Sequence, residues 1–311
     1  MTLRSIFRLY DTATPEPAAV AAAPASTSTS AVPGPGEAVR ALVAEVRYEL
    51  VPMTSVEVAI AALPAGAPVS VTCSPVKGVD ATLELTARLA DMGHDAVAHL
   101  SARMVESTDH VQRIARWMRD HDAREVFVIA GDASQPHGPY ADGCALLRDL
   151  LACATPLERV GVPAYPDGHP LIDAGPLREA LHAKQALLDD AGIRGSATTQ
   201  MCFDVARVRN WLAAERAAGL TMPIDLGVPG VVDRTRLMTM GVRLGIGASL
   251  RFLRKNRAML KLVAPGGYDP TALIAEIADD APALGIEGIH SFTFNSVADT
   301  AVWQAAVLSG D

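Results

Sequence analysis

Residues 122–151, DAREVFVIAGDASQPHGPYADGCALLRDLL, decide the fold. The apolar run at 125–131 predicts a strand, and the polar loop after it starts at Asp132 and ends near Gly143, where a helical pattern begins. A strand that is followed by a helix is the building unit of a parallel sheet, because parallel strands need a long crossover connection. The stretch therefore predicts one βα unit.

The same unit recurs along most of the chain. Predicted strands lie at 46–51, 68–73, 95–101, 125–131, 159–164, 196–202, 223–228 and 288–294, with amphipathic stretches between them. Eight such units predict an α/β fold, the (β/α)8 or TIM barrel. A doubly wound open sheet is the alternative. It usually needs a glycine-rich phosphate turn after the first strand, and YELVPMTS at 48–55 contains none.

Composition limits the class of protein. Half of the 311 residues are hydrophobic, which predicts a folded protein with a large core. The net charge of −8 argues against a general nucleic-acid binder, which usually carries a basic surplus. No run approaches the roughly 20 apolar residues of a membrane span. The four cysteines lack metal-site spacing, so we expect no metal, and scattered thiols suit a cytoplasmic protein.

The N-terminus differs from the rest of the chain. We expect residues 1–40 to form a flexible, disordered extension before a barrel domain at 41–311. Residues 12–36 are rich in Ala, Pro, Ser and Thr and lack periodic large apolar residues. The apolar residues at 6–10 belong either to a frayed terminus or to a docking peptide for a protein partner. Both interpretations stay open, as does homo-oligomerisation.

Polar residues recur where the predicted strands end. They are Glu49, Thr72, His99, Asp132, Tyr165, Gln200 and Asn295. Because the carboxyl ends of barrel strands meet on one face, this recurrence predicts one shared polar site there.

Glu49 is the first candidate for chemistry. Side-chain alternation places Arg47 and Glu49 on one face of the first strand, which we expect to point into the barrel. A poorly solvated carboxylate takes up a proton more readily, which suits a general acid. The alternative is a structural ion pair with Arg47 or a lysine.

Asp132 and Gln200 are the next candidates. Asp132 follows Gly131, which lets the backbone approach a ligand closely; the alternative is a helix N-cap. Gln200 can donate and accept hydrogen bonds at once, as recognition of a heterocycle requires. Its alternative is a core amide that is satisfied by the backbone.

Histidines and one basic segment complete the set. His99 and His169 stand at strand ends, whereas those in or beside helices are expected to be structural or exposed. These are His94, His110, His121 and His182. The segment SLRFLRKNR, 249–257, is either a solvated helix face or a site for phosphates or carboxylates.

The order of the motifs resembles the methylenetetrahydrofolate reductase family from about residue 44 onward. The matching elements are ELVP at 49–52, VSVT at 69–72, His99-Leu100-Ser101, Ala130-Gly131-Asp132, Tyr140-Ala141-Asp142-Gly143, AYPDGHP at 164–170 and TTQMCFD at 198–204. No single element decides the matter, but their common order, each near a predicted strand end, does carry the resemblance.

The resemblance implies a barrel enzyme that binds FAD, exchanges electrons with NADH or NADPH, and acts on tetrahydrofolate derivatives. Glu49 and Asp132 would be catalytic, with Glu49 as the acid that protonates folate N10. Asp132, Gln200 and Asn295 would contact the substrate. The residues implied at the FAD site are Thr72, His99, Gly131, Asp132, Tyr140, Ala141, Tyr165, His169 and Lys184, with Lys184 at the diphosphate.

Three positions depart from the family pattern. Ala130 and Ser296 stand where the family has arginine, and no aromatic residue occurs at 232–234, after the seventh strand. Two alternatives therefore stay open: direct hydride transfer from nicotinamide to folate without flavin, and a folate-binding accessory subunit without redox chemistry.

Overall fold

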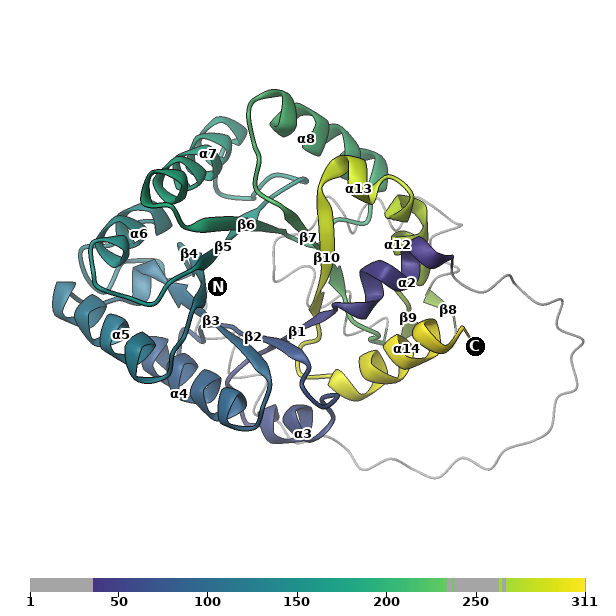
Figure 1. Cartoon of the computed structure of the whole chain (residues 1–311), viewed down its shortest axis with the longest axis horizontal. Coiled ribbons are helices and arrows are strands. Elements are labelled where there is room, and N and C mark those ends of the chain that lie inside the picture. Colours follow the sequence, from purple (N-terminus) through teal and green to yellow (C-terminus); the bar gives the residue numbers. More distant parts are fainter. Residues whose placement is uncertain (1–35, 234–236, 238–262, 265–266, 311) are drawn as a thin grey trace, which may run out of the picture.

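The computed structural model describes residues 36–233, 237, 263–264 and 267–310, and element labels follow Figure 1. Within these residues, eight parallel strands close into a barrel in the order β1-β10-β7-β6-β5-β4-β3-β2. They are β1 (Arg47–Leu50), β2 (Pro68–Val71), β3 (Asp95–Ser101), β4 (Glu125–Ile129), β5 (Arg159–Ala164), β6 (Arg194–Thr199), β7 (Ile224–Pro229) and β10 (Ile286–Phe292). The predicted TIM barrel is confirmed.

Helices surround the barrel on the outside, as Figure 1 shows. They are α2 (Glu37–Ala44), α3 (Val56–Ala61), α4 (Gly78–Asp91), α5 (Thr108–Asp120), α6 (Gly143–Leu151), α7 (Ala174–Ala191), α8 (Val205–Ala217), α12 (Thr271–Ala278), α13 (Ala281–Leu284) and α14 (Val297–Ser309). A 3-10 turn, η1 (Ala102–Met104), follows β3, and the strands β8 (Val263–Ala264) and β9 (Gly267–Tyr268) pair antiparallel before α12.

Five of the predicted strands end earlier than expected, and two of them, β4 and β10, do so for a backbone reason. Gly131, after β4, has φ +86°, and Phe294 and Asn295, after β10, have φ +51° and +62°. Left-handed backbone cannot continue a strand, so β4 stops at Ile129 and β10 at Phe292. Each predicted run still overlaps one barrel strand.

The predicted domain boundary at residue 40 is wrong, because it falls inside α2. This helix packs against α12 and α14 and buries Val39, Leu42 and Val43. The spacing of these three residues is that of one helical face, and it was available in the sequence. The rest of the predicted extension, residues 1–35, lies outside the described residues.

Side-chain caps start α6 and α8, the helices that follow β4 and β6. Asp142 accepts a hydrogen bond from the backbone N–H of Ala145 at the start of α6, and Asp204 accepts one from Arg207 at the start of α8. Each such cap stabilises a helix by about 1 kcal/mol. The loop from Gly131 to Asp142 therefore lies between a strand end and a fixed helix start.

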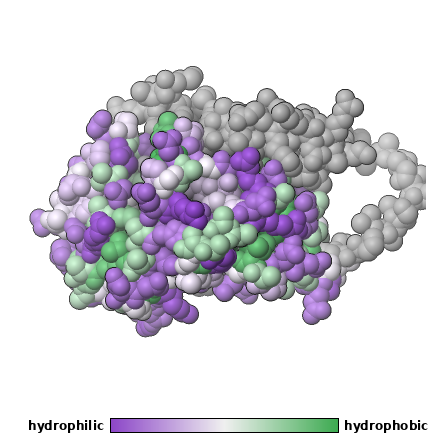
Figure 2. All heavy atoms as spheres, turned by 90° about the horizontal axis from the view of Figure 1, so that it is seen from above, coloured by the Kyte–Doolittle hydropathy of each residue, from purple (hydrophilic) through white to green (hydrophobic). Residues whose placement is uncertain are grey.

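The surface is mixed in character. On the face shown in Figure 2, hydrophilic residues predominate and hydrophobic residues form small patches among them. Among the described helices, none combines the length and the apolar composition that crossing a bilayer requires.

Candidate active site

The inward face of the barrel carries polar residues and glycines, where most such barrels have bulky apolar side chains. Phe127 pairs in register with Gly161, and Phe292 lies beside Gly227. A Cβ atom at Gly161 would lie 2.4 Å from the Phe127 ring, and one at Gly227 would lie 2.8 Å from the Phe292 ring. The two glycines thus make room for two aromatic rings inside the barrel.

Glu49 points into the barrel, as its alternation predicts. Glu49 is only 8% exposed, and its Oε2 lies 3.2 Å from Nε2 of His290, which is 3% exposed. The expected structural partner is not used, because Arg47 pairs with Asp95 at 2.9 Å. The hydroxyl of Thr293 donates to the main-chain carbonyl of Glu49 and fixes the strand beside it.

His290 was not among the predicted site residues. A signal was nevertheless present in GIHSF at 288–292, where a histidine stands in an apolar strand. What the sequence could not give was the register, which pairs His290 with Arg47 and so places it two residue pairs from Glu49 across β1 and β10.

His99 is the second buried imidazole of this region. Its ring stacks on Phe127 at 4.5 Å between centroids and lies 6.2 Å from the ring of His290. Burial lowers the pKa of His99 well below its usual value, and the nearby His290 and Arg47 lower it further. Its Nε2 has no hydrogen-bond partner among the described residues. His99 therefore offers an uncharged nitrogen inside the barrel.

Asp132, Tyr165 and His169 form a second group, at the ends of β4 and β5. The rings of Tyr165 and His169 meet edge to face at 5.3 Å. Asp132 reaches solvent at the rim, yet the surrounding protein desolvates its carboxyl and raises the pKa, while His169 opposes that rise. The predicted alternative for Asp132, a helix cap, is wrong, because α6 starts eleven positions later with Asp142 as its cap.

Desolvation also governs the other two members of this group. Burial raises the pKa of Tyr165 to about 12, and the charge of Asp132 adds to the rise. Burial lowers the pKa of His169, and Asp132 opposes the fall. At neutral pH, Tyr165 is a hydrogen-bond donor and His169 is mainly uncharged.

Gly131 is required by both its conformation and its neighbours. Its φ is +86°, and a Cβ atom there would lie 1.7 Å from Oγ of Ser101. We expected a ligand to approach the Gly131 backbone closely. On the side of the missing Cβ, Ser101 of β3 occupies that place instead. Ligand contact by the Gly131 backbone stays a prediction.

Arg103, just after β3, holds the loop that carries Asp132. Its guanidinium donates to the carbonyls of Ala133, Ser134 and Ala141, at 2.6, 2.9 and 3.1 Å. Its backbone N–H also donates to the carbonyl of Ala130, at 2.9 Å. Arg103 was not predicted, since an isolated arginine in sequence gives no indication of three carbonyl contacts that lie 30 to 38 residues away.

Lys184 lies over the first turn of α6. It is 8% exposed, and a Cβ atom at Gly143 would lie 3.4 Å from its Cε. Burial lowers the pKa of Lys184, while Cys144 and Asp142 raise it. No described residue gives it a hydrogen bond or an ion pair. A buried amine at a helix N-terminus suits a phosphate group, so the chain has a fitting place for the predicted diphosphate.

The remaining cofactor candidates are less informative. The hydroxyl of Tyr140 donates to Asp149 of α6 at 2.6 Å, so it is directed at the helix rather than offered to a ligand. Ala141 is exposed, and Thr72 is half-buried. The carbonyl of Thr72 accepts a hydrogen bond from Thr82 at 3.1 Å. Their contacts with a cofactor stay predictions.

Gln200 and Asn295 differ in what they leave for a ligand. Oε1 of Gln200 accepts from the N–H of Met201 at 2.9 Å, and among the described residues its Nε2 has no partner. Asn295 uses both sides of its amide. Its Oδ1 accepts from Val51 at 2.9 Å, and its Nδ2 donates to Val51 and Ser55 at 3.0 and 3.1 Å. Asn295 thus fastens β10 to the end of β1, and its contact with a substrate stays a prediction.

The site therefore has two halves at the carboxyl end of one barrel. Glu49, His290 and His99 come from β1, β10 and β3, whereas Asp132 and Tyr165 follow β4 and β5, and β4 lies next to β3 in the ring. The basic segment at 249–257 and the family position at 234 lie outside the described residues. Within the described ranges, no three His, Cys, Asp or Glu side chains are grouped to hold a metal ion.

Comparison with known proteins adds little beyond the fold. No protein-family model matches the chain. A proposed phosphonomutase from Burkholderia cenocepacia J2315 is 13% identical, with a TM-score of 0.47 and coverage of 88% of this chain and 97% of that one. A proposed lyase/mutase from the same organism is 17% identical, with a TM-score of 0.41 and coverage of 87% and 83%.

A third structure, the GH20 beta-N-acetylhexosaminidase from Streptomyces coelicolor A3(2), is 12% identical, with a TM-score of 0.39 and coverage of 77% and 63%. Such low identities and scores say nothing about the reaction. The chemistry has to be argued from the side chains.

Proposed function

We propose that the protein is an oxidoreductase that interconverts 5,10-methylenetetrahydrofolate and 5-methyltetrahydrofolate. The observation that carries this proposal is the buried Glu49, which faces the barrel interior and pairs with His290 at 3.2 Å. It stands at the first-strand position of the motif order described above. A carboxyl group shielded from water, with an imidazole beside it, is suited to holding and delivering one proton.

Glu49 would act on the leaving nitrogen of the substrate. In the reducing direction its carboxyl proton passes to folate N10, and the bond between N10 and the methylene carbon breaks with its electron pair on N10. The carbon stays on N5 as an iminium ion, which a hydride converts to methyl. Glu49 is left as a carboxylate beside His290, which donates a hydrogen bond to it.

The second half of the site supports recognition of the pterin. Asp132 offers carboxylate oxygens at the rim, and Nε2 of Gln200 is available as a donor. A carboxylate and an amide donor complement the mixed donors and acceptors of a pterin edge. Gln200 is tied to this rim by its backbone bond to Ala164 of β5, at 2.8 Å.

FAD, when bound, would supply the hydride after reduction by NADH or NADPH. The chain has residues that fit such a cofactor: Lys184 over the α6 N-terminus for the phosphates, Tyr165 and His169 at the barrel mouth, and His99 inside the barrel. His99 and Tyr165 are uncharged at neutral pH and would contact a flavin without adding net charge.

Direct hydride transfer from nicotinamide to folate is the second candidate. It is favoured by Ala130, which lacks the guanidinium of the family pattern. It is also favoured by Val232, which stands where the family has an aromatic residue and is buried and paired with Tyr268. A folate-binding accessory subunit is the third. The buried Glu49–His290 pair speaks against it, because a pure binding protein gains nothing from an acid that is costly to bury.

Absorption spectra and turnover of the purified full-length protein distinguish these candidates. Flavin absorption together with NADH- or NADPH-dependent reduction of methylenetetrahydrofolate supports the proposal. A colourless protein with the same activity supports direct transfer, and a colourless, inactive protein that binds reduced folate in calorimetry supports the accessory subunit. A protein that neither binds reduced folate nor turns it over contradicts all three.

A further inference from the structure

The Glu49–His290 pair has an unusual surrounding for a buried ion pair. His290 packs edge to face on Phe292, with ring centroids 5.0 Å apart, and lies 6.2 Å from the ring of His99. Its neighbour in register on β7 is Gly227, which has no side chain. The Phe292 ring limits the rotation of the His290 ring on one side, and Nε2 of His290 is directed at Glu49.

Three other titratable groups lie near the pair among the described residues, and none of them forms a hydrogen bond or ion pair with Glu49 or His290. Arg47, the register partner of His290 on β1, bonds Asp95 at 2.9 Å and the carbonyl of Val69 at 3.3 Å. Asp225, on β7, pairs in register with Gly288, two positions before His290 on β10. His99 is uncharged because burial lowers its pKa. Among the described residues, His290 is therefore the group that responds directly to the charge of Glu49.

The two carboxyl oxygens of Glu49 are not equivalent. Oε2 is held by His290, whereas Oε1 has no hydrogen-bond partner among the described residues. An oxygen that is fixed on one side and open on the other can meet a substrate atom in a defined direction. Loss of a proton from Glu49 would also create a buried negative charge, which costs several kcal/mol unless a donor faces it.

We infer that His290 is a positioning residue that orients Glu49 through Oε2 and stabilises the carboxylate left by proton transfer. The inference rests on the proposed function, in which Glu49 protonates N10. Because His290 strengthens its bond only as Glu49 becomes charged, it lowers the barrier to transfer more than it strengthens substrate binding. Its loss should therefore reduce kcat and leave KM nearly unchanged.

The kinetic test uses a graded pair of variants of the full-length protein. His290→Gln keeps a donor at a similar reach, and His290→Leu removes it. We expect His290→Leu to lower kcat about 100-fold with KM within about threefold, and His290→Gln to recover at least about tenfold of that loss. His182→Leu is the matched control, because His182 pairs with the buried Glu215 in the helix layer. It should leave kcat within about twofold.

A second measurement does not depend on turnover or on His290→Leu folding. In protein labelled with ¹⁵N-histidine, the ring-nitrogen shifts of His290 should change in Glu49→Gln, while those of His182 should not. Such a change reports the hydrogen bond between Nε2 and Oε2 directly. Thermal melts show which variants are folded.

The outcomes distinguish a failure of the role of His290 from a failure of the proposed function. An active wild type whose folded His290→Leu form keeps its kcat overturns the role of His290 and leaves the proposed function intact. Equal losses of kcat in the folded His290→Gln and His290→Leu variants also overturn the role. So do ring-nitrogen shifts of His290 that stay unchanged in Glu49→Gln. A wild type without folate turnover overturns the proposed function, and the inferred role with it.

Discussion

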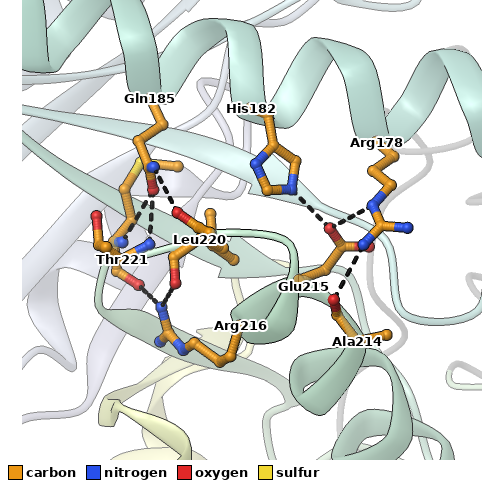
Figure 3. A network of polar contacts seen from close by, with 10 residues as sticks. Arg178, His182, Gln185, Ala214, Glu215, Arg216, Leu220 and Thr221 are labelled. Carbon is orange, nitrogen blue, oxygen red and sulfur yellow. Dashed lines mark hydrogen bonds and ion pairs between the residues drawn. The ribbon is translucent and has the colours of Figure 1, made fainter.

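Among the described residues, two Glu–His pairs contain a buried glutamate, one at the site and one in the helix layer. Glu215 of α8 lies 2.8 Å from His182 and 3.1 Å from Arg178, both on α7 (Figure 3). Glu49 lies 3.2 Å from His290 and has no arginine, because Arg47 is engaged by Asp95. Both glutamate side chains are nearly inaccessible, at 7% and 10% exposure.

The difference lies in the permanence of the partner's charge. Arginine stays protonated at any pH the protein meets, so Glu215 faces a fixed cation and serves to join α7 to α8. Glu49 has the imidazole of His290 as its partner and no guanidinium. A carboxyl group without a permanently charged partner, such as Glu49, can exchange a proton. A carboxyl group beside an arginine, such as Glu215, serves as a structural anchor.

The largest expected effect comes from removing the acid on each side of this comparison. Glu49→Gln should lower kcat for methylenetetrahydrofolate by about 10²–10⁴-fold, because the amide cannot deliver a proton. Glu215→Gln should leave the turnover per folded molecule within about twofold. Initial rates, normalised to the folded fraction, measure both. Similar rates in Glu49→Gln and wild type would remove Glu49 from its proposed role.

Removing the fixed cation should affect stability instead. Arg178→Ala leaves the buried Glu215 with His182 alone and loses the bond from Arg178 to the carbonyl of Ala214. We expect the free energy of unfolding to fall by about 3 kcal/mol, since a buried carboxylate loses a charged partner. Urea unfolding measures it, and a loss below about 0.5 kcal/mol would mean that solvent replaces the arginine.

Each region also has an arginine that binds main-chain carbonyls. Arg216 donates to Leu220 and Met222, both at 2.8 Å, and holds the turn before β7 (Figure 3). Arg103 does the same for the loop after β4, which carries Asp132. Lysine cannot reproduce this planar set of donors.

Arg103→Lys should therefore weaken reduced-folate binding about tenfold, because Asp132 loses its fixed position. Arg216→Lys is the matched control and should change stability without changing the dissociation constant. Calorimetric titration with tetrahydrofolate gives both values. Equal affinity in the two variants would show that the Asp132 loop is held without Arg103.

The smallest expected effect concerns the pH dependence of stability. The pKa of His99 in the folded protein lies below the ordinary value of 6.5, because burial disfavours its charged form. Its contribution to stability is therefore complete above pH 6.5 and is lost as the pH falls toward the folded-state value. We expect wild type to lose about 1 kcal/mol more than His99→Gln between pH 7.5 and 5.5, in urea unfolding. Equal losses would mean that His99 takes up its proton without unfolding.

The sequence by itself determined the barrel and the location of its polar end. Strand periodicity and helix starts are local properties, so all eight strands and the caps at Asp142 and Asp204 follow from short windows of residues. The inward direction of Glu49 follows from the same alternation, since a strand turns every second side chain to one side.

The tertiary structure alone decided the partners. Register between strands that lie 241 residues apart places His290 against Glu49 and leaves Arg47 to Asp95. The closing contact of Asn295 with Val51 and the three carbonyls on Arg103 are likewise long-range. Local patterns state which way a side chain points, but hydrogen-bond partners depend on angstrom-scale distances that only the closed ring fixes.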